Sequence, residues 1–313
     1  MGSDFINVIM FNKLIVNVLQ YMPQRFVWIF SKRYIAGEDL ADAISATKKL
    51  NKQGIKTTID LLGEFQSNSG KIDFYKKEYL KLIDECIHQD LDNSFSVKPT
   101  MFGLMLDQDQ CYENIREVVA RAAAHQRMIR IDMEDSQCTS MEIELYKRLL
   151  DEFPENVGLV LQAYLRRTLD DLKDLAIFDR GRQRINIRIC KGIYNEPAEL
   201  AYKDKDEINK NYITDLEFMI RNKMFVAIAT HDRYLISEAY RLIGQYGVTK
   251  DQLEFQMLYG VTPELRKSIV EKGYKMRVYV PYGRDWLKYS IRRLKENPKM
   301  MSHMIKALFV RGL

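Results

Sequence analysis

The segment "INIRICKGIYNEP" (residues 185–197) places a charged residue inside a short apolar run. The β-branched run 185–190 predicts a strand that is buried on both faces. Arg188 lies in the middle of this run, and a buried guanidinium needs a partner. After the run, Gly192 allows the backbone to approach a ligand, and Pro197 is placed as at a helix start. The segment therefore predicts a buried strand that leads into a binding loop.

Seven further runs of this kind alternate with segments of helical periodicity along the chain. The predicted strands cover residues 56–62, 95–104, 128–133, 157–165, 185–190, 224–230, 253–258 and 276–280. The clearest helical segments are 72–92, 107–125, 198–221 and 232–246. Several helices are expected to begin at residues that favour helix starts, namely Asp107, Thr168 and Thr262 with Pro263.

Strands that alternate with helices pair in parallel through βαβ crossovers. Eight such units over roughly 250 residues are the number and size of a (βα)8 TIM-type barrel, which is an α/β fold. A doubly wound open sheet is the alternative, but it usually has fewer strands, and the sequence lacks the G-x-G-x-x-G motif of a dinucleotide-binding sheet. We therefore expect an N-terminal helical segment (residues 1–45) packed on a barrel domain (residues 46–313).

The composition is that of a globular protein with a mild excess of positive charge. Of 313 residues, 46% are hydrophobic and 29% are charged, and the net charge is +5. No block of five or six Lys and Arg residues is present, which argues against binding to nucleic acid. Four widely spaced cysteines without a C-x-x-C motif are typical of free thiols in a reducing compartment, so we expect a cytoplasmic protein. Four histidines without an H-x-x-x-H pair argue against a protein-bound zinc, and we expect no metal site.

The first 30 residues are apolar but do not predict a membrane span. Asn12, Lys13, Asn17 and Gln20 interrupt every apolar run well short of the roughly 18 residues that a span needs. The order of regions that defines a secretory signal peptide is also absent. Two alternatives stay open, an amphipathic helix packed on the domain and a helix that lies on a membrane surface. The second would place the protein peripherally at the inner face of the membrane.

Polar side chains gather at the ends of the predicted strands, where a barrel of this type has its active site. They include Asp60, Glu64, Lys98, Asp132, Glu134, Gln162, Arg188, Lys191, Thr230, His231, Glu254, Gln256 and Tyr279. Any one of them, taken alone, has a structural explanation, since a lysine, for example, can extend its charged end to solvent. Lys98, Asp132 and Arg188 are harder to explain in this way, because each lies inside a strand. Three charges within three barrel strands predict a shared cavity, in which they neutralise one another or a charged ligand.

The segment "WLKYSIRRLKENP" (residues 286–298) predicts a helix with two arginines beside its apolar face. At 100° per residue, one stripe is formed by Trp286, Leu287, Ser290, Ile291 and Leu294. Tyr289, Arg292 and Arg293 cluster on the neighbouring sector. On this helix alone the arginines are most simply solvated. After a barrel, however, the stripe can dock on the strands and carry Arg292 and Arg293 over the rim.

The strand-end motifs resemble those of the proline dehydrogenase family, and the resemblance covers nearly the whole chain. The pieces that carry it are "LLGE" (61–64), "VKPT" (97–100), "IDMEDS" (131–136), "QAYLRR" (162–167), "RICKGIYNEP" (188–197), "ATHD" (229–232), "FQMLYG" (255–260), "YVPYG" (279–283) and "YSIRRLKENP" (289–298). They follow the family's order, each at a predicted strand end or in the closing helix. One departure is Ile193, where alanine is common in the family.

The resemblance implies a (βα)8 barrel that binds FAD at its C-terminal rim without a Rossmann domain, closed by a C-terminal helix. It implies that Arg188 lies beside the flavin N5 edge and that the flavin is held by Met133, Gln162, Lys191, Gly192, Ile193, Thr230 and His231. Substrate-binding positions of the family match Lys98, Tyr279, Arg292 and Arg293, and the catalytic pair is Asp132 with Arg188. Glu64 matches a carboxylate that pairs with Arg292 as a gate over the occupied site.

The reaction implied by the resemblance is the first step of proline catabolism. Two guanidiniums and an ammonium bind the carboxylate of L-proline by charge-assisted hydrogen bonds, and hydride passes from C5 to flavin N5. The product is 1-pyrroline-5-carboxylate, and the electrons pass on to a quinone or another acceptor. Two alternatives stay open: another (βα)8 enzyme, such as an aldolase with Lys98 or Lys191 as a Schiff-base lysine, and a non-catalytic membrane-surface protein.

Overall fold

The computed structural model describes residues 27–28, 31–182 and 185–296, with side chains up to residue 291. In this part of the chain, eight strands form one closed barrel in chain order, and every neighbouring pair is parallel. The strands are β1 (Lys56–Leu61), β2 (Asn93–Val97), β3 (Ile129–Ile131), β4 (Val157–Gln162), β5 (Asn186–Cys190), β6 (Phe225–Ala229), β7 (Leu253–Leu258) and β8 (Met276–Tyr282). The predicted (βα)8 barrel is confirmed.

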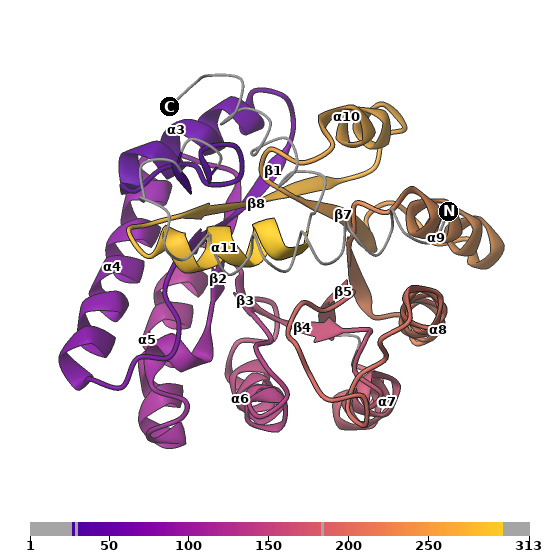
Figure 1. Cartoon of the computed structure of the whole chain (residues 1–313), viewed down its shortest axis with the longest axis horizontal. Coiled ribbons are helices and arrows are strands. Elements are labelled where there is room, and N and C mark those ends of the chain that lie inside the picture. Colours follow the sequence, from indigo (N-terminus) through magenta and orange to yellow (C-terminus); the bar gives the residue numbers. More distant parts are fainter. Residues whose placement is uncertain (1–26, 29–30, 183–184, 297–313) are drawn as a thin grey trace, which may run out of the picture.

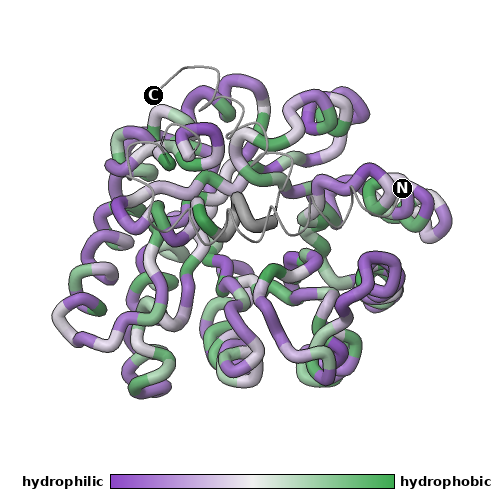
Figure 2. Tube along the Cα trace, in the orientation of Figure 1, coloured by the Kyte–Doolittle hydropathy of each residue, from purple (hydrophilic) through white to green (hydrophobic). Residues whose placement is uncertain are grey.

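Helices surround the barrel, and the last one lies across the strands in the view of Figure 1. They are α3 (Leu40–Asn51), α4 (Ser69–His88), α5 (Gln108–Ala123), α6 (Thr139–Glu152), α7 (Thr168–Asp179), α8 (Lys205–Arg221), α9 (Arg233–Tyr246), α10 (Pro263–Glu271) and α11 (Trp286–Glu296), with a short 3-10 helix η1 (Pro99–Phe102). Figure 2 shows hydrophobic and hydrophilic residues alternating along the outer helices, as expected for helices with one buried face.

The strands are buried on both faces, which is the usual condition of a parallel barrel. Successive side chains point to opposite faces of a strand, so β2 directs Phe95 and Val97 toward the helices and Ser96 into the barrel. The outer layer is apolar: Tyr79 of α4 packs on Phe102 with ring centroids 5.5 Å apart, and its hydroxyl donates to the Ser96 carbonyl. The interior layer, in contrast, contains many of the polar residues predicted at the strand ends.

The predicted strand at residues 95–104 is wrong from residue 98 onward. Strand β2 ends at Val97, and the chain turns into η1, which begins with Pro99. Proline lacks the N–H that a central strand needs, and its fixed φ suits the first residue of a helical turn. Gly103, at φ 94°, then ends the turn in the left-handed region. Lys98 is consequently the last extended residue and lies at the barrel rim.

The helical segment predicted at 198–221 is also too long at its start. Helix α8 begins at Lys205, where the Asp204 side chain accepts hydrogen bonds from the next turn. Residues 197–202 instead pair with the segment after β4, through an isolated bridge between Leu165 and Ala201 and a hydrogen bond from Tyr202 N to Tyr164 O. Pro197 therefore begins a turn, in which Ala201 N donates to its carbonyl, and not a helix.

The predicted helix starts differ in their chemistry. Asp107 caps α5 as expected, since its carboxylate accepts from two backbone N–H groups of the first turn. Thr168 is the first residue of α7 and not its cap, and its hydroxyl donates to the Gln162 carbonyl over 2.6 Å. Thr262 occupies the cap position of α10, but its hydroxyl donates to Met257 Sδ and makes no capping hydrogen bond to the helix, and Pro263 is the first helical residue.

The predicted division at residue 45 falls within α3, and most of the segment before it lies outside the described residues. The N-terminal helical segment and its contact with a membrane surface therefore stay predictions. In the part of the chain that is described, no helix is long and apolar enough to cross a membrane. The four cysteines are free thiols, as expected.

Candidate active site

A cavity of about 450 Å³ opens at the carboxyl ends of the strands. Its lining includes most of the predicted site: Lys98, Asp132, Met133, Gln162, Arg188, Lys191, Gly192, Ile193, Thr230, His231 and Tyr279. Tyr289 of α11 also lines it and is 5% exposed. Residues from seven strand ends and the last helix thus meet at one place, and the volume is in the range of small-molecule sites.

Three predicted residues lie elsewhere or are not described. Glu64 follows β1 and lines a neighbouring cavity of about 230 Å³, which shares Tyr289 with the main one. Arg292 and Arg293 belong to α11, three and four residues after Tyr289, but their side chains lie outside the described residues. The gate formed by Glu64 and Arg292 therefore stays a prediction.

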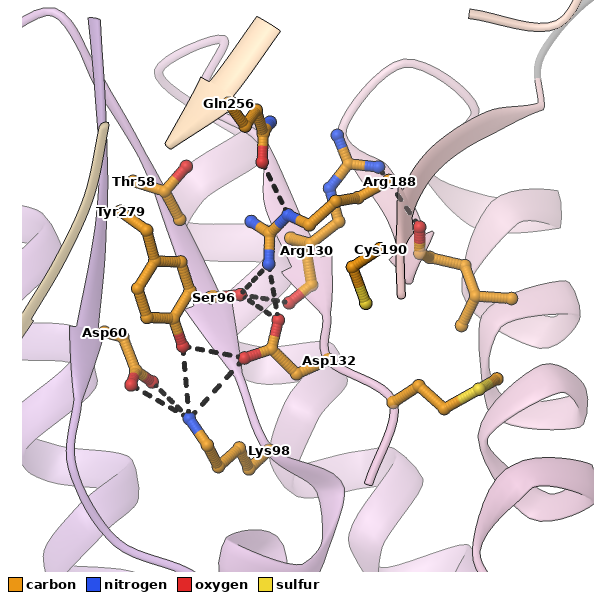
Figure 3. A network of polar contacts seen from close by, with 12 residues as sticks. Thr58, Asp60, Ser96, Lys98, Arg130, Asp132, Arg188, Cys190, Gln256 and Tyr279 are labelled. Carbon is orange, nitrogen blue, oxygen red and sulfur yellow. Dashed lines mark hydrogen bonds and ion pairs between the residues drawn. The ribbon is translucent and has the colours of Figure 1, made fainter. Parts of the chain in front are cut away.

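Lys98 is held at the centre of a buried polar network (Figure 3). Its ammonium donates to both carboxylate oxygens of Asp60, at 2.8 and 2.9 Å, and lies 3.5 Å from Asp132 Oδ2. The Tyr279 hydroxyl donates to the same Asp132 oxygen over 2.9 Å and lies 3.3 Å from the ammonium. β1, β2, β3 and β8 are therefore joined through their inward-facing side chains.

Arg188 completes the network from the opposite wall of the barrel (Figure 3). Its Nη1 donates to Asp132 Oδ1 over 2.8 Å, and its Nε donates to Gln256 Oε1 over 2.6 Å. The guanidinium carbon lies 5.2 Å from the centroid of the Tyr279 ring. In the described part of the chain, Nη2 has no hydrogen-bond partner although it is buried. A buried donor in that position is available to a ligand in the cavity.

The charges of this cluster follow from burial and from its ion pairs. Burial opposes ionisation of Asp132, but Lys98 and Arg188 hold its pKa below the ordinary value, so it is a carboxylate at neutral pH. Burial raises the pKa of Asp60 to about 6 against the effect of Lys98. Burial disfavours the charged form of Lys98, but Asp60 and Asp132 raise its pKa well above the ordinary value. A raised pKa and an ion pair with Asp60 both favour the charged ammonium, which is not a nucleophile, and so argue against a Schiff base at Lys98.

The loop after β5 approaches the cavity through a glycine. Gly192 has a φ of 104°, and a Cβ atom there would overlap the ring of Tyr164. Lys191 pairs with Asp232 over 2.7 Å, which joins this loop to the end of β6. Lys191 is the second candidate Schiff-base lysine, and its amino group is engaged in this ion pair. Ile193 is 36% exposed, so its bulk points at least partly away from the packed interior. The loop can therefore offer its backbone to a ligand.

Three further side chains at the rim have defined donor and acceptor groups. Gln162 donates from Nε2 to the carbonyls of Met133 and Glu134, at 3.1 and 2.8 Å. Its Oε1 is buried and has no partner in the described part of the chain. The Nε2 of His231 accepts from the backbone N–H of Leu258 over 2.9 Å, which makes that nitrogen the unprotonated one. Thr230 Oγ1 accepts from the backbone of Asp232.

The sequence did not single out Ser96 as a site residue, and it gave no specific role in the cavity to Gln256 or Tyr289. Ser96 donates to Asp132 Oδ1 and lies 3.4 Å from Arg188 Nη1. The period of a strand could have identified it, because it lies two residues before Lys98 and so on the same face. Gln256 is recognisable in the same way, from its place at the end of β7, whereas Tyr289 reaches the cavity only through the position of α11.

The sequence model of the family described as proline dehydrogenase matches residues 43–306. The proline dehydrogenase of Deinococcus radiodurans is 34% identical over 294 residues, which are 93% of either chain. Proline dehydrogenase 2 of Bacillus subtilis (strain 168) is 35% identical over 276 residues, 88% of this chain and 89% of that protein.

Among solved structures, proline utilization A (PutA) of Bdellovibrio bacteriovorus, inactivated by N-propargylglycine, matches with a TM-score of 0.81 and 26% identity. The match covers 86% of this chain and 32% of that one, so this chain spans about a third of that protein. PutA of Corynebacterium freiburgense matches with a TM-score of 0.74 at 23% identity, which shows the fold alone. Sequence and barrel geometry agree, and the chain belongs to the proline dehydrogenase family.

Proposed function

We propose that the protein oxidises L-proline to 1-pyrroline-5-carboxylate with FAD, as the first step of proline catabolism. The observation that carries the proposal is the Asp132–Arg188 ion pair, which closes over 2.8 Å inside a cavity lined by the family's motifs. Relatives that cover nine tenths of the chain are proline dehydrogenases. The reaction converts the C5–N bond of proline to a double bond, with loss of a hydride from C5 and a proton from nitrogen.

The described residues fit a flavin on one side of the cavity. Two buried polar atoms, Arg188 Nη2 and Gln162 Oε1, lack partners within the described part of the chain and match a ring system with both acceptors and donors. Gly192 packs against the ring of Tyr164, which leaves no room for a side chain there, and the positive φ of the glycine fixes the course of the loop along this wall. Met133, Lys191, Ile193, Thr230 and His231 would complete this wall. When bound, FAD supplies the two-electron acceptor for the hydride.

The opposite side of the cavity fits the substrate. Lys98 lies there and Arg188 lies between the two sides, and Asp60 and Asp132 balance their two positive charges when ionised. A proline carboxylate therefore needs further cations, which we assign to Arg292 and Arg293, one helical turn beyond Tyr289 on α11. Fixing the carboxylate at this end orients the proline ring, and orientation of this kind can lower a barrier by roughly 7–11 kcal/mol at most.

The remaining residues hold and shield the reacting groups. Asp132 fixes Arg188 and Tyr279 at the same time, because each donates to a different carboxylate oxygen. Arg188 would thereby present a positive charge to a bound flavin and would stabilise the negative charge that the flavin gains on reduction. Tyr279 and Tyr289 contribute aromatic surface that excludes water from the cavity.

Two finer assignments belong to the same proposal. The electrons pass from the flavin to a quinone-type acceptor, and the protein works in the cytoplasm, in peripheral contact with the inner face of the membrane. The apolar N-terminal segment of the sequence supports such contact. Pelleting with liposomes, compared between the full chain and one without residues 1–26, tests it; equal pelleting would contradict a role of that segment.

The catalytic proposal is tested with the purified protein and its bound chromophore. We expect flavin absorbance in the preparation and proline-dependent reduction of an artificial acceptor, with 1-pyrroline-5-carboxylate as product. Cyclopentanecarboxylate is the matched control, because it has the ring and the carboxylate but no nitrogen to form the imine. A flavin-free protein that does not take up FAD, or a flavin-loaded protein that ignores proline, would contradict the proposal.

A further inference from the structure

We propose that Glu254, which lies in the barrel interior below the cavity, tunes Arg188 through Gln256 and so adjusts the reduction potential of the bound flavin. This inference rests on the proposed function, because it takes Arg188 to lie beside the flavin. Glu254 does not line the cavity, so it is a positioning residue that touches neither substrate nor cofactor.

A chain of hydrogen bonds leads from Glu254 to Arg188. Glu254 Oε1 accepts from Arg277 Nε over 2.8 Å and from Gln256 Nε2 over 2.6 Å. Gln256 Oε1 in turn accepts from Arg188 Nε over 2.6 Å. Glu254 and Gln256 lie two residues apart on β7, on the inward face of the strand. The chain therefore connects the ion pair with Arg277 to the guanidinium in the cavity.

The chemistry of the two end groups orients the amide between them. An ionised carboxylate only accepts hydrogen bonds, and a guanidinium only donates them. Gln256 can satisfy both only with its NH2 group toward Glu254 and its carbonyl oxygen toward Arg188. Burial opposes ionisation of Glu254, but Arg277 lowers its pKa, so the carboxylate keeps its charge. A charged neighbour strengthens the acceptor at the far end of a hydrogen-bonded amide.

Because the hydrogen-bonded chain is buried, the charge of Glu254 can act on Arg188 across the intervening Gln256. Glu254 is 2% exposed, Gln256 4% and Arg277 9%, so little solvent screens the chain. Arg188 already has one carboxylate partner, Asp132. A second carboxylate in direct contact would cancel its positive charge toward the cavity, whereas one placed behind a neutral amide weakens it only in part. The arrangement thus sets an intermediate charge at Arg188.

Moving this charge along the chain tests the inference. Glu254→Gln removes the charge, and the double variant Glu254→Gln/Gln256→Glu moves it one link closer to Arg188. In the double variant each hydrogen bond can persist, since Gln at 254 accepts from Arg277 and donates to Glu at 256. Glu271→Gln is the control, because it removes one negative charge from an exposed pair with Lys267 on α10.

The readout is the midpoint potential of the bound flavin, measured in the holoenzyme by spectroelectrochemistry. We expect a positive shift in Glu254→Gln, a negative shift in the double variant and no shift in the control. A purely structural role of Glu254 would lower the thermal unfolding temperature without this opposite ordering. Equal potentials in wild type and both variants would overturn the inference.

Two outcomes separate this inference from the proposed function. If Glu254→Gln does not fold because Arg277 loses its counter-charge, the double variant decides, because Glu at 256 returns a carboxylate in register with Arg277 on the neighbouring strand; an unshifted potential there overturns the inference. A wild-type protein that binds no flavin would remove the proposed function and this inference together. A wild-type flavin that proline reduces, with unchanged potentials in the variants, would overturn the inference alone.

Discussion

Replacing Asp132 by Asn should destabilise the protein strongly, although the two side chains have the same shape. Asp132 is the only carboxylate paired with Arg188 in the described part of the chain, whereas Lys98 keeps Asp60. The variant therefore leaves one buried guanidinium without a counter-charge, and its new NH2 group faces donors. Breaking a buried pair in this way costs about 3–5 kcal/mol. The free energy of unfolding of the holoenzyme should fall by that amount at pH 7.

Turnover should fall as well, because Asp132 orients Arg188 and Tyr279 together. A misplacement of about 1 Å can cost roughly 100-fold in rate, so we expect at least this loss in kcat with most of the flavin retained. Urea unfolding and stopped-flow reduction of the flavin measure the two effects. The wild-type advantage should disappear in acid as pH falls through the lowered pKa of Asp132. A stability loss below about 1 kcal/mol, together with a normal kcat, would contradict the role of Asp132 as the counter-charge of Arg188.

Three further predictions concern other parts of the molecule. Gly192→Ala should lower the flavin-to-protein ratio, because its Cβ would overlap Tyr164 at a positive φ. Asp215→Asn should flatten the pH dependence of unfolding. Burial raises the pKa of Asp215 to about 8, so the free energy of unfolding of the wild type falls as pH rises from about 4 toward 8. The variant has no carboxyl group at this position and should lack the decline. Arg292→Ala and Arg293→Ala should each raise the KM for proline at least about 30-fold, or about 2 kcal/mol, as for loss of one partner of a desolvated pair.

Each of these predictions has a control. Gly181→Ala also places a Cβ at a positive φ but meets no atom within 4 Å, so normal flavin content should result. Asp73→Asn removes an exposed carboxylate and should leave the stability profile in place. Normal flavin content in Gly192→Ala, an unchanged pH slope in Asp215→Asn, or an unchanged KM in both arginine variants would contradict the respective prediction.

The barrel could be predicted because its strands are short, apolar and regularly spaced between helices. Strand β7 occupies the predicted residues, and β5 differs by one residue at its start. The polar residues at strand ends were also recognisable, since a charge such as Arg188 inside a buried run has no structural use without a partner. Parallel strands bring their carboxyl ends to one rim, so residues far apart in sequence could be placed in one cavity.

Less predictable was where a segment pairs with a distant strand end and does not continue a helix. The start of α8 depends on pairing between Ala201 and Leu165, a contact between segments 36 residues apart that periodicity does not reveal. The partners of Arg188 were likewise only partly accessible: Asp132 was expected, but the hydrogen bond to Gln256 depends on the stagger between β5 and β7 around the closed barrel. Strand spacing predicts which residues face inward but not which of them meet.

Anaerobic reduction of the enzyme by proline labelled with deuterium tests the central claim most directly. In a single turnover, followed by loss of flavin absorbance, we expect proline to bleach the flavin and deuterium at C5 to slow the bleaching. Deuterium at C2 should leave the rate nearly unchanged, because that C–H bond stays intact. A flavin that proline does not bleach, or a rate that responds to C2 and not to C5, would contradict the assignment of this cavity to oxidation of proline at C5.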